Sequence, residues 1–274
     1  MSDLLPGLSG YLPIKNNFEL DYCAQLSVRS LLPICNEVII VDGGSTDNTL
    51  PFFEEWATWE PKLRIVHYEI PRLPTPEEVE RDDLTRPSGN PIMLIPWLEA
   101  GRKACRYSWQ ITLDGDEVLD EGSYPYIKPA IEYGYPCWMN RVNLWKSPQW
   151  EAPHGTVCGE RVVRLAPTRM EMCSDEPRPE GEPEIRRTAV NGDNMAIIHL
   201  GFLRKQTEFL KKSRVMQGWL MNTYDSRLRQ AEQTGESWVA LSPFPEGKPL
   251  IPCNRKFAPY VNEWLVERGH TLNP

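Results

Sequence analysis

The chain has 274 residues, of which 30 are basic and 38 acidic, so its formal net charge is −8. Its 41% hydrophobic and 25% charged residues are close to globular averages, which excludes collagen, coiled coils and disorder throughout. There is neither a run of about 18 apolar residues nor a secretory signal at the N-terminus. We therefore expect a soluble protein without an integral membrane segment, located in the cytoplasm (that of the host, if a phage encodes it).

The cysteines and the net charge restrict the kinds of metal site and of binding partner that we expect. Seven cysteines without Cys-x-x-Cys spacing predict buried free thiols, and neither a disulfide framework nor a zinc knuckle. The negative charge argues against sequence-blind binding to long stretches of phosphate backbone, but it leaves room for a local basic groove. The 10 Trp residues fit either core packing or stacking on sugars and bases.

The first 70 residues predict alternating strands and helices. The four β-branched residues 38–41 form a continuous apolar run that ends in Asp-Gly-Gly, a pattern typical of a buried parallel strand. Helix-capping residues follow this turn. The expected elements are a strand at 10–14, a helix within 18–32, a strand at 38–41, a helix at 50–59 and a strand at 63–70. This order indicates an open α/β sheet.

The rest of the chain continues the α/β pattern with less regularity. Residues 71–91 are rich in proline and charge, and a capping box at 75–78 predicts a short surface helix. Further on we expect a helix at 97–106, strands at 109–113, 137–145, 161–165 and 194–202, an acidic loop at 173–187 and a long helix at 206–234. We expect one domain over 1–205, with a helical extension over 206–274 packed on it.

The strongest chemical signal is Asp114-Gly115-Asp116-Glu117, directly after the strand expected at 109–113. Ligands of α/β proteins bind outside the carboxyl ends of parallel strands. Two carboxylates separated by one residue can face a divalent cation there, and their mutual repulsion would leave the pair unstable without one. Mg²⁺ or Mn²⁺ held together with substrate phosphates is the expected arrangement, and an exposed turn with spare charge is the alternative.

A second signal is the turn Asp42-Gly43-Gly44-Ser45-Thr46-Asp47, which follows the strand at 38–41. Its glycines allow a ligand to approach the backbone closely, and a carboxylate at a strand end can accept hydrogen bonds from a ribose or a base. A turn that merely reverses the chain is the alternative.

These motifs, in this order, resemble the family 2-type GT-A glycosyltransferases. The segments LPIKNN, VIIVDGGSTDNT and LDGDEVL carry the resemblance, which covers residues 9–120, just under half of the chain. It implies the GT-A fold, a Rossmann-like open mixed sheet flanked by helices. It also implies transfer of a sugar, with inversion, from a nucleotide-sugar, and we expect a UDP-sugar. The domain would then divide into a donor-binding half over 1–120 and an acceptor-binding half over 121–205.

The resemblance also assigns residues to the donor site. The turn after the first strand would line the base pocket, the Asp-Gly-Gly turn would contact uracil or ribose, and the Asp-Gly-Asp turn would contact ribose and a metal–diphosphate group. The implied donor-binding residues are Pro13, Lys15, Asn16, Asp42, Gly43, Asp114, Gly115, Arg204 and Lys205. The implied ligands of Mn²⁺ or Mg²⁺ are Asp114, Asp116 and His199. Two departures affect the donor side: many members have a second Asp where this chain has Gly43, and an Arg-Asn pair where it has Trp97–Gly101.

A third signal is the stretch His199-Leu200-Gly201-Phe202, which Arg204 and Lys205 follow. In related enzymes a late His-x-Gly supplies a further metal or diphosphate contact. A neutral imidazole is a good ligand for ions such as Mn²⁺, and adjacent cations neutralise a departing diphosphate. The alternative is a hydrogen-bonded histidine packed at a strand end.

An inverting transfer needs a carboxylate that takes the proton of the acceptor. In related enzymes this group comes from a segment after the Asp-x-Asp, and Asp175 and Glu176 are the best-placed candidates. Glu160 and Asp193 are further candidates, and a solvated acidic surface is the alternative.

Other patterns narrow the reaction class. The chain has no GxGxxG, Walker A or GxSxG motif, which argues against dehydrogenases and kinases. The QxxRW sequence of processive sugar polymerases is also missing, which favours a single transfer. Arg161 and Arg164 could reach an anionic acceptor, but they alternate with apolar residues, as on the wet face of a strand.

We therefore expect a metal-dependent glycosyltransferase whose partners are a nucleotide-sugar and an acceptor glycan, a lipid-linked sugar or a modified DNA base. The Trp content and the basic runs at 186–187 and 211–214 favour a hydroxymethylated DNA base, as in phage enzymes, whereas the acidic total charge counts against it. Two alternatives from other classes remain. A GT-A-fold nucleotidyltransferase would normally carry a Gly-rich basic N-terminal signature, and a carbohydrate-binding module would not need the Asp-x-Asp.

Overall fold

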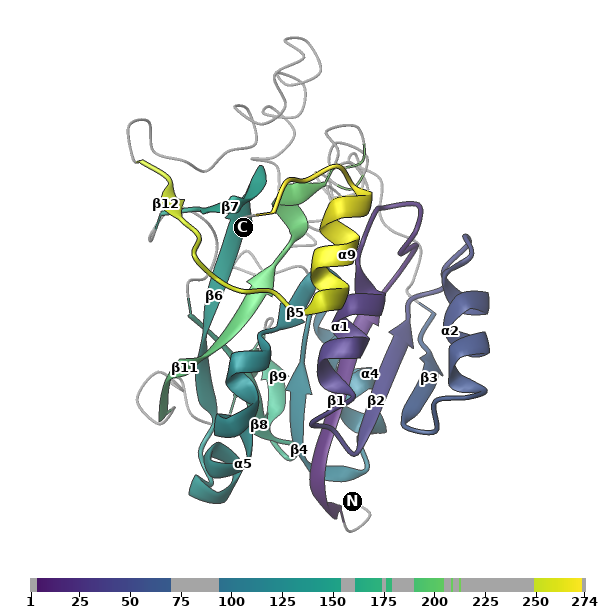
Figure 1. The fold of residues 1–274 in the computed structure, drawn as a ribbon. Coiled ribbons are helices and arrows are strands. Elements are labelled where there is room, and N and C mark those ends of the chain that lie inside the picture. Colours follow the sequence, from purple (N-terminus) through teal and green to yellow (C-terminus); the bar gives the residue numbers. More distant parts are fainter. Residues whose placement is uncertain are drawn as a thin grey trace, which may run out of the picture.

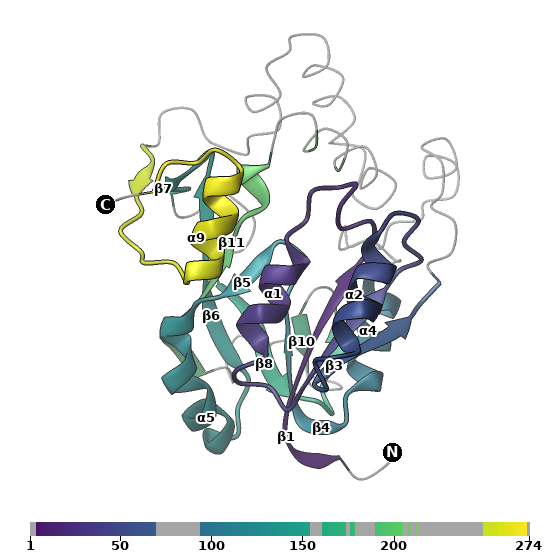
Figure 2. The same ribbon diagram turned by 45° about the vertical axis from the view of Figure 1, so that its right-hand side comes forward.

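In the computed structural model, one mixed β-sheet runs through the molecule and helices cover both of its faces (Figure 1, Figure 2). The structure describes residues 4–69, 94–153, 161–173, 176–178, 190–204, 208, 212 and 249–272. The first strands are β1 (Leu5–Ile14), β2 (Glu37–Asp42), β3 (Leu63–His67) and β4 (Tyr107–Thr112). They are parallel and lie in the order β4-β1-β2-β3. Because β2 and β3 are added on one side of β1 and β4 on the other, the strand order reverses at β1.

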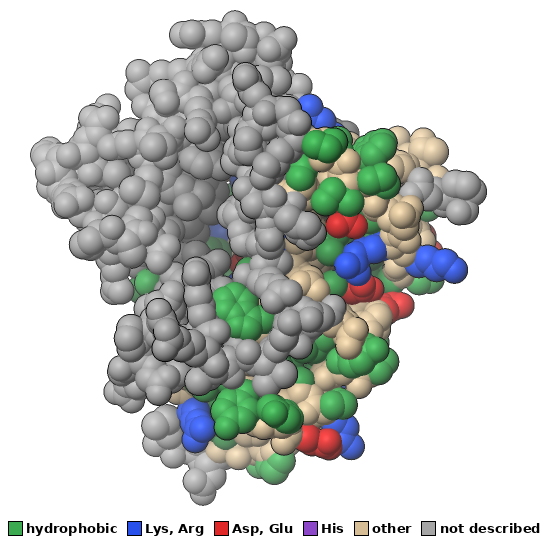
Figure 3. Space-filling view, turned by 90° about the vertical axis from the view of Figure 1, so that its left-hand side faces the viewer, with side chains coloured by type: hydrophobic (Ala, Val, Ile, Leu, Met, Phe, Trp, Pro, Cys, Tyr) green, Lys and Arg blue, Asp and Glu red, His purple; other side chains and the backbone are tan. Residues whose placement is uncertain are grey.

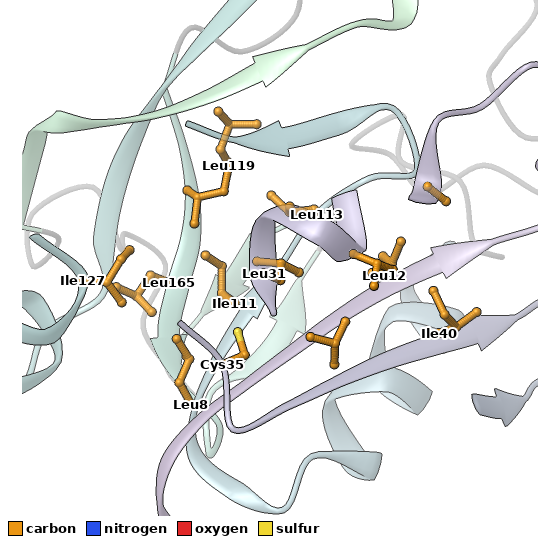
Figure 4. Packing of buried hydrophobic residues seen from close by; sticks show 14 of the residues in the cluster. Leu8, Leu12, Leu31, Cys35, Ile40, Ile111, Leu113, Leu119, Ile127 and Leu165 are labelled. Carbon is orange, nitrogen blue, oxygen red and sulfur yellow. The ribbon is translucent and has the colours of Figure 1, made fainter. Parts of the chain in front are cut away.

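Residues 38–41 of β2 are apolar on both faces because helices cover both. The helices of this half are α1 (Ala24–Leu31), α2 (Thr49–Ala57) and α4 (Leu94–Ala104). Val38 and Ile40 of β2 belong to the core that α1 and α2 share, whereas Ile39 and Val41 belong to the core under α4. Figure 1 shows α1 in front of the sheet and α4 behind it, and Figure 4 shows Leu31 of α1 inside the first core.

The second half adds antiparallel strands. Its elements are β5 (Glu117–Leu119), η1 (Glu121–Ser123), α5 (Tyr124–Tyr133), β6 (Cys137–Trp145), β7 (Ser147–Glu151), β8 (Arg161–Pro167), β9 (Glu171–Cys173), β10 (Glu176–Arg178), β11 (Val190–His199), η3 (Gly201–Leu203), β12 (Ile251–Pro252) and α9 (Pro259–Glu267). The sheet follows the order β12-β7-β6-β8-β4-β1-β2-β3. β8 is antiparallel to both β4 and β6, and β11 joins the sheet parallel to β6 and antiparallel to β5.

The C-terminal helix α9 covers a second core. Pro259 lies in its first turn, where the missing N–H and the fixed φ of proline suit a helix. Val261, Trp264 and Leu265 follow at helical spacing and pack in one cluster with Ile198 of β11. This spacing would have located α9 within the helical extension expected over 206–274, for which no helix bounds were given at these residues.

The α/β class with an open mixed sheet is confirmed, and so is the strand–helix alternation over the first 70 residues. The helix expected within 18–32 begins only at Ala24, after Asp21 takes a φ of 50°. The loop expected at 173–187 is wrong in part, because β9 and β10 pair as an antiparallel hairpin. The helix expected at 75–78 lies outside the described residues, and so does most of 206–234.

The cysteines agree with the expectation for free thiols. Four of the described cysteines are buried and form no disulfide with one another: Cys23, Cys35, Cys105 and Cys137. Burial raises the pKa of Cys23 to about 12 and that of Cys137 to about 11, so both thiols stay protonated at neutral pH. They therefore act as small apolar side chains.

The described surface is mixed in character. Figure 3 shows charged and hydrophobic side chains intermixed over the described part of one face. Among the more exposed large hydrophobic residues, Tyr133 and Tyr135 have ring centres 5.8 Å apart, whereas Trp59 lies after α2. None of the helices in the described part of the chain combines the length and the apolarity that crossing a membrane demands.

Candidate active site

Three polar turns lie at the carboxyl ends of neighbouring parallel strands. The turn at 15–17 follows β1, the turn at 43–47 follows β2, and the turn at 113–116 follows β4. Because β1 lies between β2 and β4, at the reversal of strand order, the turns surround the position where α/β proteins bind ligands. These strand ends and turns carry the expected donor-binding residues Pro13, Lys15, Asn16, Asp42, Gly43, Asp114 and Gly115.

The first two turns are bonded to each other. Asn16 donates its backbone N–H to Ser45 Oγ at 2.9 Å and accepts at Oδ1 from the Thr46 N–H at 2.8 Å. The ammonium group of Lys15 donates to the Gly43 carbonyl at 3.0 Å. These bonds fix the backbone of both turns at the end of β1.

Asp42 closes the turn that it begins. Its buried carboxylate accepts at Oδ2 from the Gly44 N–H at 3.0 Å and from the Ser45 N–H at 3.1 Å. Gly44 has a φ of 78°, in the left-handed region that favours glycine. The carboxylate is thus held in one orientation, and a carboxylate has further lone pairs with which to accept from a ligand.

Asp116 is buried among cationic side chains. Its Oδ2 lies 2.8 Å from Arg204 Nη1 and 2.8 Å from Lys212 Nζ. His199 Nε2 lies 3.6 Å from the same oxygen. Although burial opposes ionisation, these neighbours hold the pKa of Asp116 well below its usual range, so the carboxylate is charged.

The other two carboxylates of the motif face buried arginines. Arg164 of β8 is fully buried, and its Nη2 lies 2.9 Å from Asp114 Oδ2 and 3.0 Å from Glu117 Oε2. Arg141 of β6 lies 2.9 Å from Glu117 Oε1 through its Nε and 3.5 Å from Asp114 Oδ2 through its Nη2. Each charge of this network, which comprises Asp114, Glu117, Arg141 and Arg164, thus has partners of opposite sign, as buried charges require.

The network overturns one argument made from the sequence and weakens a second. The expectation that Arg164 lies on the wet face of its strand is wrong, because its side chain has 0% exposure and pairs with carboxylates inside the protein. The repulsion between Asp114 and Asp116, which predicted a bound cation, is offset within the chain, since each carboxylate faces its own cationic side chains. The metal-binding role of Asp114 stays a prediction.

Strand β11 carries His199 to the motif. In the antiparallel β5–β11 pair His199 lies opposite Glu117, and the Leu200 N–H donates to the Asp116 carbonyl at 2.9 Å. Burial and the charge of Arg141 lower the pKa of His199, and Asp116 opposes them only in part. The imidazole is therefore neutral at neutral pH, which is the form that binds metals.

Gly201 packs closely against Asp116 and His199. A Cβ at Gly201 would lie 2.6 Å from His199 Nε2 and 2.7 Å from Asp116 Oδ2, so the site has no room for a side chain there. A carboxylate and a neutral imidazole suit Mn²⁺. The described residues hold no group of three or more His, Cys, Asp or Glu gathered for a metal. The metal-binding roles of Asp116 and His199, which would need further ligands from substrate or water oxygens, stay predictions.

The expected base lies on a separate hairpin. Glu176 is the first residue of β10, in register with Cys173 of β9, and the hairpin packs against α4 and β8. Asp175 and Lys205 lie outside the described residues. The roles of Glu176, Asp175 and Lys205 stay predictions.

The sequence analysis assigned no role to three further residues of the site. Glu117 and Arg141 complete the network under Asp114, and Tyr22 lies against the cations at Asp116. The sequence offered one signal for the arginine network, which is Glu117, the third carboxylate of the Asp-Gly-Asp-Glu motif. A buried acidic residue at a strand start requires a cationic partner.

No protein-family model matches the chain, and neither does any curated protein. Among solved structures, residues 1–349 of S. aureus TarS share 12% identity with it, over 88% of this chain and 75% of that one, with a TM-score of 0.42. The same TarS fragment in complex with UDP-GlcNAc gives 11% identity, coverages of 86% and 73%, and a TM-score of 0.42. Glucosyl-3-phosphoglycerate synthase from Mycobacterium tuberculosis, in complex with Mn²⁺, UDP and glucosyl-3-phosphoglycerate, shares 20% identity over 51% of this chain and 44% of that one, with a TM-score of 0.29. These likenesses are loose, and the fold given above follows from the strand order itself.

Proposed function

We propose that the protein is a glycosyltransferase that moves one sugar from a nucleotide-sugar to an acceptor hydroxyl. The donor that we propose is a UDP-sugar. One observation carries the proposal. Three polar turns meet where the strand order reverses, and the carboxylate of Asp116 lies there among cationic side chains. A nucleotide-sugar combines a nucleoside with a diphosphate. The turns at 15–17 and 43–47 offer hydrogen-bonding groups for the first, and the cations beside Asp116 offer charge for the second.

Each part of the nucleotide-sugar can be assigned to residues that would bind it. The base and ribose would lie along Pro13, Asn16 and the Asp42–Gly43 turn, where the fixed carboxylate of Asp42 can accept from an N–H or a hydroxyl. The diphosphate would lie beside Arg204, whose guanidinium matches the geometry of phosphate oxygens. Asp116 holds the cations in place before the donor binds, so little rearrangement is needed during the reaction.

Mn²⁺ or Mg²⁺, if bound, would be held by Asp116 and His199. Such an ion supplies positive charge that stabilises a leaving diphosphate. Arg204 and Lys212 of the chain neutralise the same charge directly, because both reach the oxygen of Asp116 that faces the site.

Inverting transfer also requires a base. The acceptor hydroxyl attacks the anomeric carbon while the bond to the diphosphate breaks, and a carboxylate takes the hydroxyl proton. We assign this role to Glu176 or Asp175, with the acceptor (a glycan, a lipid-linked sugar or a hydroxymethylated DNA base) bound by the half of the domain over 121–205. The acidic sequence at 173–187 in that half would suit a neutral hydroxyl acceptor better than a long phosphate backbone.

Thermal unfolding in the presence of nucleotide-sugars tests the proposal. A ligand that binds only the folded state at 100 times its Kd adds about 2.7 kcal/mol to the free energy of unfolding. We expect a UDP-sugar with Mn²⁺ to raise Tm more than GDP-, CMP- or dTDP-sugars do. NAD⁺ is the control, because the chain lacks the dinucleotide motif. A panel in which no nucleotide-sugar raises Tm, with or without Mn²⁺, would refute the proposed function.

Gly201→Ala is expected to weaken the Mn²⁺-dependent binding of UDP about tenfold, because overpacking a filled space costs on the order of 1–3 kcal/mol. The new Cβ would occupy the space beside His199 Nε2 and Asp116 Oδ2. Calorimetric titration of UDP with and without Mn²⁺ measures the effect. Gly122→Ala is the matched control, since its Cβ would approach no atom closer than 3.6 Å. Equal affinities of the two variants would contradict the assigned space.

A further inference from the structure

The ring of Tyr22 lies against two cations at once. Arg204 Cζ is 4.5 Å and Lys212 Nζ is 4.6 Å from the centre of the ring, within the range of cation–π interactions. The same two side chains meet at Asp116 Oδ2, each at 2.8 Å. Two positive charges are therefore held within reach of one carboxylate oxygen and one aromatic face.

The charges of this cluster do not cancel. Among the side chains that the structure describes, the carboxylate of Asp116 lies 2.8 Å from each of the two cations Arg204 and Lys212, so these three groups carry one negative and two positive charges. Like charges this close repel each other, and the negative face of an aromatic ring offsets part of that repulsion without neutralising the charge. The cluster thus keeps surplus positive charge, which favours a small polyanion.

The backbone fixes the position of the ring. The Tyr22 N–H donates to the Asn17 carbonyl at 2.8 Å, and the Asp21 carbonyl accepts from Arg204 Nε at 2.8 Å. The ring also packs close to the Asp-Gly-Asp turn, since a Cβ at Gly115 would lie 3.2 Å from Tyr22 Cδ1. Tyr22 is therefore held between the turn that carries Asp116 and the cations that bind Asp116.

We propose that Tyr22 is a positioning residue of a diphosphate-binding site. Its ring keeps Arg204 and Lys212 together at Asp116, where the two cations bind the diphosphate of the nucleotide-sugar; this assignment rests on the proposed function. Tyr22 acts through the two cations and touches neither the sugar nor the base. The nucleoside is bound by other turns, so loss of the ring affects binding of the diphosphate alone.

Binding of inorganic pyrophosphate and of uridine, measured separately by calorimetry without divalent cations, tests the proposal. We expect Tyr22→Leu to weaken pyrophosphate binding about tenfold, as loss of cation–π contacts to two partly desolvated cations predicts. Uridine binding should not change. Tyr22→Phe keeps the aromatic face and should restore pyrophosphate affinity. Tyr133→Leu removes an exposed tyrosine at the end of α5 and is the matched control.

A second set of variants keeps the test decisive if Tyr22→Leu folds poorly. Tyr22→Met fills a similar length without an aromatic face and should show the same selective loss. In a Lys212→Gln background, Tyr22→Met should weaken pyrophosphate binding less than it does in the natural chain, because one of its two partners is already gone. Full additivity of the two changes would overturn the role of Tyr22.

The outcomes separate this proposal from the proposed function. Pyrophosphate binding that is unchanged in both ringless variants overturns the role of Tyr22 and leaves the glycosyltransferase standing. Failure of the protein to bind pyrophosphate at all overturns the site. Pyrophosphate binding that depends on Tyr22, in a protein that turns over no nucleotide-sugar, supports the site and refutes the proposed function.

Discussion

Asp116→Asn is expected to lower kcat/KM for the sugar donor at least ~100-fold, about 2.7 kcal/mol of transition-state stabilisation. The amide keeps the volume of the side chain but removes the charge that Arg204, Lys212 and His199 face. The two cations then lose their common partner, and the proposed metal would lose its carboxylate ligand. Release of UDP from the donor, with and without acceptor, measures the loss.

Asp120→Asn provides the matched control. Asp120 lies four positions further on, and its carboxylate pairs with Arg255 instead of the cations of the site. Asparagine can also keep the hydrogen bond to the Gly122 N–H. We expect its turnover to stay at the level of the natural chain. Turnover by Asp116→Asn that equals that of Asp120→Asn would remove Asp116 from the mechanism.

Arg164→Met is expected to lower the free energy of unfolding by about 3 kcal/mol, near the lower end for removing one partner of a buried ion pair. The change leaves the fully buried Glu117 with only Arg141 as an arginine partner, and Asp114 loses its shorter contact. Urea unfolding, read from the midpoint and the slope, measures the loss.

An exposed ion pair gives the contrast for that prediction. Lys128 and Glu132 form an i,i+4 pair on α5 with side chains 87% and 64% exposed. Lys128→Met should change the free energy of unfolding by less than about 0.5 kcal/mol, because water screens such pairs. The double variant Arg164→Met, Glu117→Gln should lose less than the sum of its parts, since no unpaired charge is left at Glu117. Equal effects of Arg164→Met and Lys128→Met would contradict the buried network.

The strands and the location of the site could be predicted because both follow from local patterns. Residues 38–41 are continuously apolar because α1, α2 and α4 cover both faces of β2, and that character alone predicts a buried parallel strand. The turns at 15–17, 43–47 and 113–116 each follow such a strand, and parallel strands end at the same edge of a sheet. The common location of these turns in one site could therefore be predicted from the sequence.

The buried arginines could not be predicted, because their environment depends on long-range pairing. Arg164 alternates with apolar residues, as it would on a half-exposed strand, yet β8 lies between β4 and β6 inside the sheet. Arg141 meets Glu117 only because β11 pairs with both β5 and β6. The register of those pairs is not encoded in any local window of sequence. The same limit applies to Tyr22, whose cationic partners come from the distant C-terminal part of the chain.

The short ladder between β5 and β11 has a consequence for how such a protein can diversify. Residues 117–119 pair with residues 197–199, and the Leu200 N–H bonds directly to the Asp116 carbonyl. His199 is thus tied to Asp116 by main-chain bonds, whatever the chain does between them. Changes between 120 and 190 that keep β6 and β8, the strands that carry Arg141 and Arg164, can alter this part of the chain without shifting the pair. The part of the sheet that carries Asp116 and His199 can therefore stay unchanged while its surroundings vary.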